Sequence, residues 1–384
     1  MKNKAFILFV IGILIASPII ITDTEKSKPL IVWYTVAKYI GPDLFEKAEI
    51  YNPDIVILSV FAEDDVLPLN GSKTFDLEGT VKKLHDMGIW VYYSFSLFSR
   101  SMYEEIKSTG LNVNDCVHVS DYSKYLRETN PDEYHRLFDY YLERGLDPEK
   151  IPKVERKPIE GYYVPIGHKT MVDPLYMPYR DFIADVIKEM IEKAEPDGLV
   201  FDHGRFFTFD EGYNQDIRKW ILDRTDFDIY NYTPKPIFQI TDWTEEDILY
   251  YDTRAELIKY AVSDIVSNFT QYPIFATTIG MIEPARTNGQ YVELQTEVFD
   301  SLLLMEYGDE DLAVEKNIKE TAEKIGSYKI ILGLSKAQES ETHIRNIELG
   351  LKYNVKGIYL LGYDFPEDVH EYLLNIRNIN YSKV

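Results

Sequence analysis

The chain has little cysteine and lacks the short motifs of several enzyme classes. Cys116 is the only cysteine among the 384 residues, so no disulfide can form within the chain. No G-x-S-x-G, H-E-x-x-H or H-x-H sequence occurs, which argues against a serine hydrolase and against a catalytic metal. No G-x-G-x-x-G follows the first predicted strand, which argues against a dinucleotide-binding fold. We therefore expect neither a metal nor a cofactor.

Positive charge is scarce relative to negative charge. The chain has 41 Lys and Arg against 64 Asp and Glu, for a formal net charge of −23. A surface this acidic repels phosphate backbones, so nucleic acid is not an expected partner. Neutral or cationic substrates fit it better. The alternative is that the negative charge only keeps the protein soluble. Hydrophobic residues make up 45% and aromatic residues 14%, which is enough for a large core.

The N-terminus has the pattern of an export signal. Lys2 and Lys4 precede an apolar run from Ala5 to Ile21, and acidic residues restore polarity at Asp23. A charged start followed by an apolar segment is typical of a secretion signal, and a run of this length also suits a membrane tether. We expect residues 1–22 to be a signal peptide or N-terminal membrane anchor, and the protein to be secreted or held outside the cell.

Eight short segments rich in β-branched and aromatic residues recur along the rest of the chain. Several are continuously apolar, as expected of parallel strands that are covered on both faces. They are Ile31–Thr35, Ile55–Ser59, Ile89–Ser94, Gly198–Asp202, Pro273–Thr278, Ser301–Glu306, Lys329–Leu334 and Gly357–Gly362.

The last four of these segments begin at residues 273, 301, 329 and 357, one every 28 residues. That spacing fits a strand, a helix and two loops. Helical patterns fill the gaps at Tyr179–Ala194, Asp311–Ile325 and Glu339–Tyr353, and Gly88, Gly326 and Asn354 follow helix ends as C-caps would. Eight such units favour an α/β fold with a single (β/α)₈ TIM barrel over residues 29–384, rather than an open doubly wound sheet.

Two gaps between strands are too long for a simple crossover. About a hundred residues follow the third strand and about seventy follow the fourth. Both insertions leave the carboxyl end of a strand, where barrel enzymes build their sites, so we expect them to form walls of a substrate cleft. The alternative is that they pad one side of the barrel. The second insertion supplies the aromatic residues Trp220, Tyr230, Tyr232, Trp243, Tyr250 and Tyr251.

The most informative segment is Pro196–Phe207, PDGLVFDHGRFF, because an apolar strand ends there abruptly in Asp202, His203 and Arg205. A carboxylate at this point faces the mouth of a barrel, where a low dielectric and a nearby guanidinium set its pKa. We predict Asp202 as the nucleophile or base of a catalytic site. The alternative is an ion pair between Asp202 and Arg205 at the rim.

The same segment resembles the glycosidase-like barrel superfamily, in particular its uncharacterised glycosyl hydrolase groups and polygalactosaminidase-type relatives. Their fourth strand reads Asp-Gly-(apolar)-x-(apolar)-Asp, followed by Arg and an aromatic residue. Asp197, Gly198, Asp202, Arg205 and Phe206 match this pattern, and an Asp-Pro pair at Asp173 and Pro174 introduces the preceding helix as in those proteins. The pattern departs at His203 and Gly204, where the family has an aromatic and an apolar residue. The resemblance implies a glycosidase-like barrel.

Glycoside hydrolysis needs a second carboxyl group on another strand. Our first choice is Glu306, at the end of the sixth strand, which analogy with related barrels also favours. Asp364 after the eighth strand and Glu283 after the fifth are the other choices. Arg205, His203, Tyr34, Tyr93, Asp364 and Tyr363 are the predicted substrate-binding residues, since they end strands and offer rings or polar groups to a sugar.

We therefore expect an exported glycoside hydrolase that cleaves a polysaccharide or surface glycan with paired carboxylates. The alternative is a carbohydrate-binding or cell-surface barrel without catalysis. The sequence indicates no oligomeric state.

Overall fold

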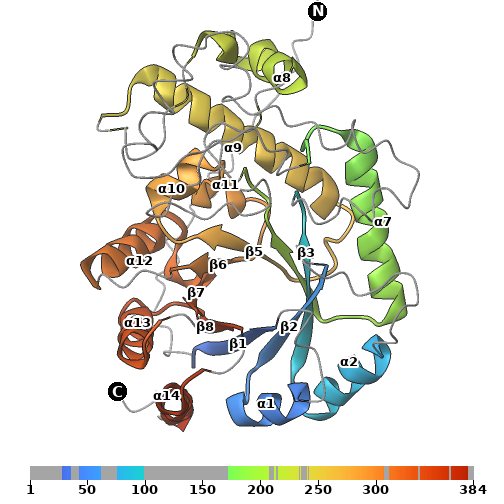
Figure 1. Cartoon of the computed structure of the whole chain (residues 1–384), viewed down its shortest axis with the longest axis vertical. Coiled ribbons are helices and arrows are strands. Elements are labelled where there is room, and N and C mark those ends of the chain that lie inside the picture. Colours follow the sequence, from blue (N-terminus) through green and yellow to red (C-terminus); the bar gives the residue numbers. More distant parts are fainter. Residues whose placement is uncertain are drawn as a thin grey trace, which may run out of the picture.

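The computed structural model describes residues 28–35, 43–61, 76–98, 172–206, 212, 215–232, 234, 240, 242–306, 311–335, 338–362 and 365–378. Its eight strands are all parallel and close into a barrel in chain order, from β1 beside β2 round to β8 beside β1 (Figure 1). The predicted TIM barrel is confirmed. The strands are β1 Leu30–Thr35, β2 Ile55–Phe61, β3 Trp90–Ser96, β4 Gly198–Asp202, β5 Ile274–Ile279, β6 Ser301–Met305, β7 Ile330–Ser335 and β8 Gly357–Leu361.

Helices surround the barrel on its outside (Figure 1). They are α1 Leu44–Tyr51, α2 Leu77–Asp86, α7 Met177–Lys193, α8 Gln215–Thr225, α9 Glu245–Val266, α10 Ile282–Thr287, α11 Val292–Gln295, α12 Asp311–Ile325, α13 Ser340–Lys352 and α14 Glu367–Asn378, with short 3₁₀ turns at Ile229–Asn231 and Ser327–Lys329. Gly88, Gly326 and Asn354 take left-handed backbone angles, with φ of 78°, 85° and 53°, as expected of residues that end helices before strands.

Side chains along each strand alternate between the barrel interior and the layer beneath the helices. The interior cluster is separate from the larger cluster that packs strands against helices. Two glycines make room for interior tyrosines: a Cβ at Gly198 would lie 2.5 Å from the ring of Tyr92, and one at Gly333 would lie 2.3 Å from the ring of Tyr359. The interior residues are Val32, Tyr34, Ile55, Ile57, Tyr92, Val200, Phe275, Leu303, Ile331 and Tyr359.

Three aspartates just before even-numbered strands fix the amino-terminal end of the barrel. Asp54 accepts a hydrogen bond from the amide of Ile31 at 2.8 Å, Asp197 from Val91 at 2.7 Å, and Asp300 from Ile274 at 2.8 Å. Each carboxylate thus satisfies a donor at the start of the preceding strand, which would otherwise lack a partner. Asp197, the first residue of the sequence motif, therefore has a structural role at the end of the barrel opposite the mouth.

The insertion after β4 contains three tyrosines that pack against one another. Tyr250 and Tyr251 on α9 are 1% and 0% exposed, and Tyr232 lies with its ring centroid 4.6 Å from that of Tyr250. These three rings are buried packing groups, and the expectation that they line a substrate cleft is wrong for them. Figure 1 shows α8 lying beyond α9, further from the barrel. The insertion after β3 falls mainly at 99–171, outside the described residues.

No helix in the described ranges is long and apolar enough to cross a membrane. The predicted signal or anchor at residues 1–22 lies outside those ranges, and so does Cys116.

Candidate active site at the barrel mouth

Asp202 is the last residue of β4, and alternation along that strand places its side chain on the interior side with Val200. In register, Asp202 is paired with Ser96, the last residue of β3. Its side chain is 21% exposed. The fourth strand therefore directs this carboxylate into the carboxyl-terminal end of the barrel, where barrel enzymes build their sites.

Hydrogen bonds from three elements hold the Asp202 carboxylate. Oδ1 accepts from the hydroxyl of Thr277 on β5 and, at 2.7 Å, from the backbone amide of His203. Oδ2 lies 3.4 Å from the Tyr34 hydroxyl on β1, which in turn lies 2.6 Å from the Ser94 hydroxyl on β3. Donors aimed at a carboxylate favour its ionised form and fix its orientation.

The electrostatic surroundings also favour an ionised Asp202. Burial by itself would raise the pKa of this carboxyl group, but the charge of His203, the hydrogen bond from Thr277 and the charge of Arg205 outweigh it. The net effect holds the pKa of Asp202 below its ordinary value of 3.8. Asp202 is thus an anion at neutral pH, which suits a nucleophile or base and not a proton donor.

His203 is fixed beside Asp202 by its backbone and by its ring. Its φ of 51° lies in the left-handed region. Ring atom Nδ1 lies 2.6 Å from the hydroxyl of Ser96 and 3.8 Å from Oδ1 of Asp202, and the side chain is 18% exposed. Sequence reasoning missed Ser96 and Thr277. Both are interior-facing residues on strands next to β4, so strand alternation was the signal that could have found them.

Glu306 is hydrogen-bonded to the outer helix α12. It follows Met305, the end of β6, and is 3% exposed. Its Oε2 accepts a hydrogen bond at 3.0 Å from the amide of Asn317 on α12, and the same oxygen would lie 2.6 Å from a Cβ placed at Gly280. Glu306 is thus held between the strand ends and the outer helix, and these contacts do not bring it to Asp202.

Tyr93 is also placed away from the mouth, which contradicts its predicted role in binding substrate. It is 0% exposed, and its hydroxyl donates at 2.7 Å to the carbonyl oxygen of Ala194 at the end of α7. The reason is alternation: Tyr92 and Ser94 take the interior positions of β3, so Tyr93 faces the helices. Tyr34, by contrast, does lie at the mouth, with 6% of its surface exposed.

Of the other predicted site residues, Arg205 has a described side chain and three do not. Tyr363 and Asp364 lie outside the described residues, and Glu283 falls within α10 without a described side chain. Arg205 is 9% exposed and acts on Asp202 through its charge. Asp173 accepts a hydrogen bond from the amide of Leu175 at 2.8 Å just before α7, so the Asp-Pro pair does precede that helix.

Asp202 stands among hydroxyl and apolar side chains at the carboxyl ends of the strands. By alternation, the interior-facing residues near these ends are Tyr34, Ser59, Ser94, Ser96, Asp202, Thr277, Ile279, Met305, Ser335 and Leu361. Asp202 is the only carboxylate in this set. Within the described parts of the chain, no group of three or more His, Cys, Asp or Glu could hold a metal ion.

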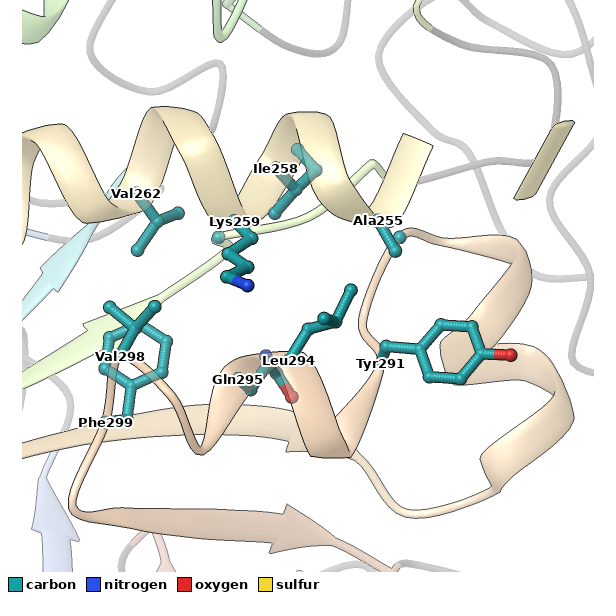
Figure 2. A pocket seen from close by; sticks show the side chains of 11 residues that line it. Ala255, Ile258, Lys259, Val262, Tyr291, Leu294, Gln295, Val298 and Phe299 are labelled. Atoms are coloured by element: carbon teal, nitrogen blue, oxygen red, sulfur yellow. The ribbon is translucent and has the colours of Figure 1, made fainter. Parts of the chain in front are cut away.

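One small cavity lies beside the turn that follows β4. It is lined by Gly204, by residues of α9 such as Ile258 and Val262, and by Leu294 of α11, and it measures about 10 Å³ (Figure 2). That space holds one water molecule at most, far less than a ligand pocket of several hundred Å³. A larger hollow of about 540 Å³ lies between α8 and α9, and another of about 510 Å³ lies at the amino ends of the strands. Asp202 lines neither of them.

Comparison with known proteins supports the fold. No protein-family model matches the chain. The catalytic domain of a beta-amylase from Paenibacillus polymyxa superposes with a TM-score of 0.54 at 10% identity, covering 92% of this chain and 98% of that one. A beta-galactosidase from the psychrophilic Marinomonas ef1 superposes with a TM-score of 0.51 at 9% identity, covering 91% of this chain and 59% of that one. At these identities the likeness shows the barrel fold alone.

Sequence matches to curated proteins are partial. The chain is 32% identical over 109 residues to the large ribosomal subunit protein uL18 of Aeropyrum pernix, and 45% identical over 51 residues to that of Ignicoccus hospitalis. These matches cover 28% and 12% of this chain. The chain spans 45% and 25% of the length of these two relatives.

Proposed function

We propose that this protein is an exported glycoside hydrolase that cleaves the glycosidic bonds of a polysaccharide or surface glycan, with Asp202 as its nucleophile or base. The observation that carries the proposal is the ionised carboxylate of Asp202 at the mouth of a barrel, held by Thr277 and by the amide of His203. Two glycoside-cleaving enzymes, a beta-amylase and a beta-galactosidase, share the barrel fold and add support by analogy.

The chemistry assigned to Asp202 follows from its charge. An anionic carboxylate stabilises the positive charge that develops at an anomeric carbon, and it either attacks that carbon or removes a proton from the attacking water. A second group must protonate the leaving oxygen. Glu306, the first choice from the sequence, is held by Asn317, so its contacts do not support that role. The proposal for Asp202 stands whichever group donates the proton.

A second candidate function is carbohydrate binding without catalysis. The observation that favours it is the single carboxylate among the described interior-facing strand ends, where a hydrolase normally presents two. Hydroxyl groups from Tyr34, Ser94, Ser96 and Thr277 would then bind sugar hydroxyls, and Asp202 would accept hydrogen bonds from the ligand.

A glycan panel with a matched variant separates the two functions. The wild-type protein is incubated with soluble and insoluble polysaccharides, release of reducing ends is measured, and binding is followed on the same glycans. We expect wild type to cleave at least one glycan, and Asp202→Asn to lose that activity while still binding it with nearly unchanged Tm. Binding without cleavage by wild type would favour the second function. A wild-type protein that neither binds nor cleaves any glycan of the panel would refute both functions.

Export is part of the proposal and has its own test. The charged and apolar N-terminal residues support it, and fractionation of expressing cells would locate the full chain outside the cytoplasm. Recovery of the full chain in the cytoplasm alone would remove export from the proposal without affecting the assignment of Asp202.

A further inference from the structure

The backbone of His203 is held in a conformation that few residue types adopt. Four non-glycine residues in the described parts of the chain have a positive φ, and the other three are Asn52, Asp226 and Asn354. Asn, Asp and His are the non-glycine residues most enriched in this region, and the strain of each must be offset by its surroundings. Such conformations concentrate at functional sites. The turn after β4 therefore holds an imidazole at the mouth at some conformational cost.

Two side chains lie close to one ring nitrogen of His203. Nδ1 lies 2.6 Å from Oγ of Ser96, and Ser96 is itself only 2% exposed, so this hydrogen bond is shielded from water. The same nitrogen lies 3.8 Å from Oδ1 of Asp202, and the ring retains 18% exposure. An imidazole is thus positioned beside the ionised carboxylate and also reaches the solvent-accessible mouth.

We propose that His203 is the general acid of the barrel mouth, with Ser96 as its positioning residue. The proposal rests on the proposed glycoside hydrolase function and identifies the second proton-transferring group of that reaction. Imidazole exchanges a proton near neutral pH, which suits a residue that donates and later recovers one.

Asp202 and His203 together account for every bond and proton that the reaction exchanges with the protein. In the first step Asp202 forms a bond to the anomeric carbon, the bond from that carbon to the leaving oxygen breaks, and the proton on Nε2 of the imidazolium passes to that oxygen. In the second step water attacks the anomeric carbon, the bond to Asp202 breaks, and the neutral imidazole takes the proton from water. Ser96 holds Nδ1 throughout, so Nε2 faces the substrate.

The charged groups around this pair are few among the described residues. The carboxylate of Asp202 lies beside the ring, and the positive charge of Arg205 acts on Asp202. Thr277 from β5 and Tyr34 from β1 contact Asp202 as hydroxyl donors. A pair of one carboxylate and one imidazole therefore takes the place of the two carboxyl groups that glycoside hydrolysis ordinarily employs.

Leaving-group chemistry tests the assignment. The variant His203→Asn keeps a residue type that tolerates the left-handed backbone, and Ser96→Ala removes only the hydroxyl that holds the ring. Each is assayed on the glycan that wild type cleaves and on the 2,4-dinitrophenyl glycoside of the same sugar, whose phenolate leaves without a proton. We expect His203→Asn to lower kcat/KM on the glycan by about 10²–10⁴-fold and to change the formation of the dinitrophenolate much less.

The pH profile gives a second readout. Wild type should lose activity on the glycan as the imidazolium deprotonates at high pH, and His203→Asn should lack that alkaline limb. Ser96→Ala should displace the limb and lower kcat more than it changes KM. Equal losses on both substrates, or an unchanged alkaline limb in His203→Asn, would overturn the role of His203. If Asp202→Asn loses activity on the glycan and His203→Asn keeps it, the proposed function stands and only the role of His203 is refuted.

Discussion

The hydrogen bond from Thr277 to Asp202 offers the sharpest test of how the site sets its charge. Thr277 on β5 is 4% exposed, and its hydroxyl donates to Oδ1 of Asp202. Thr277→Val removes this donor while keeping the shape of the side chain. Asp202 then retains the amide of His203, at 2.7 Å, as its donor on the same oxygen. The variant therefore changes the stability of the carboxylate without removing the carboxylate.

The size of the effect follows from the kind of bond lost. A hydrogen bond to a charged group contributes about 1.5–3 kcal/mol, and 1.36 kcal/mol corresponds to about a tenfold change in proton affinity. The wild-type surroundings lower the pKa of Asp202, so the ionised form persists until the pH falls below the ordinary carboxyl range. Removing the donor raises the pKa. We expect Asp202 in Thr277→Val to bind its proton at least about tenfold more tightly. As the pH is lowered, the variant should therefore lose activity at a higher pH than wild type.

The assay is the dependence of kcat/KM on pH with the glycan that wild type cleaves. The acidic limb of this profile should move to higher pH in Thr277→Val. Thr277→Ser keeps a hydroxyl, so its profile should resemble that of wild type. Stability against pH should follow from the same shift. The part that comes from ionised Asp202 is present above the carboxyl range and is lost as the pH falls through the lowered pKa of the folded state. In the variant this part should be smaller, and its loss should be complete at a higher pH. An acidic limb that does not move, with Tm preserved, would refute the assignment of Asp202 as the ionised catalytic group.

Three further substitutions test the placement of individual side chains. Glu306→Gln should keep kcat/KM within a few-fold of wild type, because Glu306 contacts Asn317, whereas loss of a catalytic acid would lower kcat/KM by about 10²–10⁴-fold. Tyr93→Phe should lower the free energy of unfolding in urea by about 1–3 kcal/mol without changing kcat/KM, because the Tyr93 hydroxyl donates to the Ala194 carbonyl. A changed KM with unchanged stability would instead support a role for Tyr93 in binding substrate. Gly333→Ala should destabilise the barrel by about 1–3 kcal/mol through the Tyr359 ring, and Tyr359→Leu in the same chain should recover part of that loss; additive effects in a double-mutant cycle would contradict the contact.

The fold was predictable because its signals are local. A strand covered on both faces must be apolar over several residues, so all eight strands could be located, and the predicted Gly198–Asp202 matches β4 residue for residue. Residues that end helices before strands also have a local signature, since Gly88, Gly326 and Asn354 need a left-handed backbone. The helix α12 begins and ends where the apolar periodicity predicted, at Asp311 and Ile325.

The site was predictable only in part, because it depends on which way each side chain faces. Asp202 was found because a charge ends an apolar strand. Glu306 gave the same signal, yet it bonds to Asn317 of α12. Tyr93 was predicted as an aromatic ring near a strand end, yet the alternation of β3 turns it toward α7. Ser96 and Thr277 were missed because a single hydroxyl residue within a strand has no distinctive pattern. Their importance appears only once β3, β4 and β5 are placed side by side.

The chemical role of Asp202 can be measured most directly by replacing its carboxylate with an external anion. In Asp202→Gly the site loses its nucleophile, and sodium azide can take the vacated position beside the anomeric carbon of an activated aryl glycoside. We predict that this variant releases the phenol very slowly alone, that azide restores release by a large factor, and that the sugar is recovered as a glycosyl azide of a single anomeric form. An Asp202→Gly protein that remains as active as wild type without azide would contradict the account.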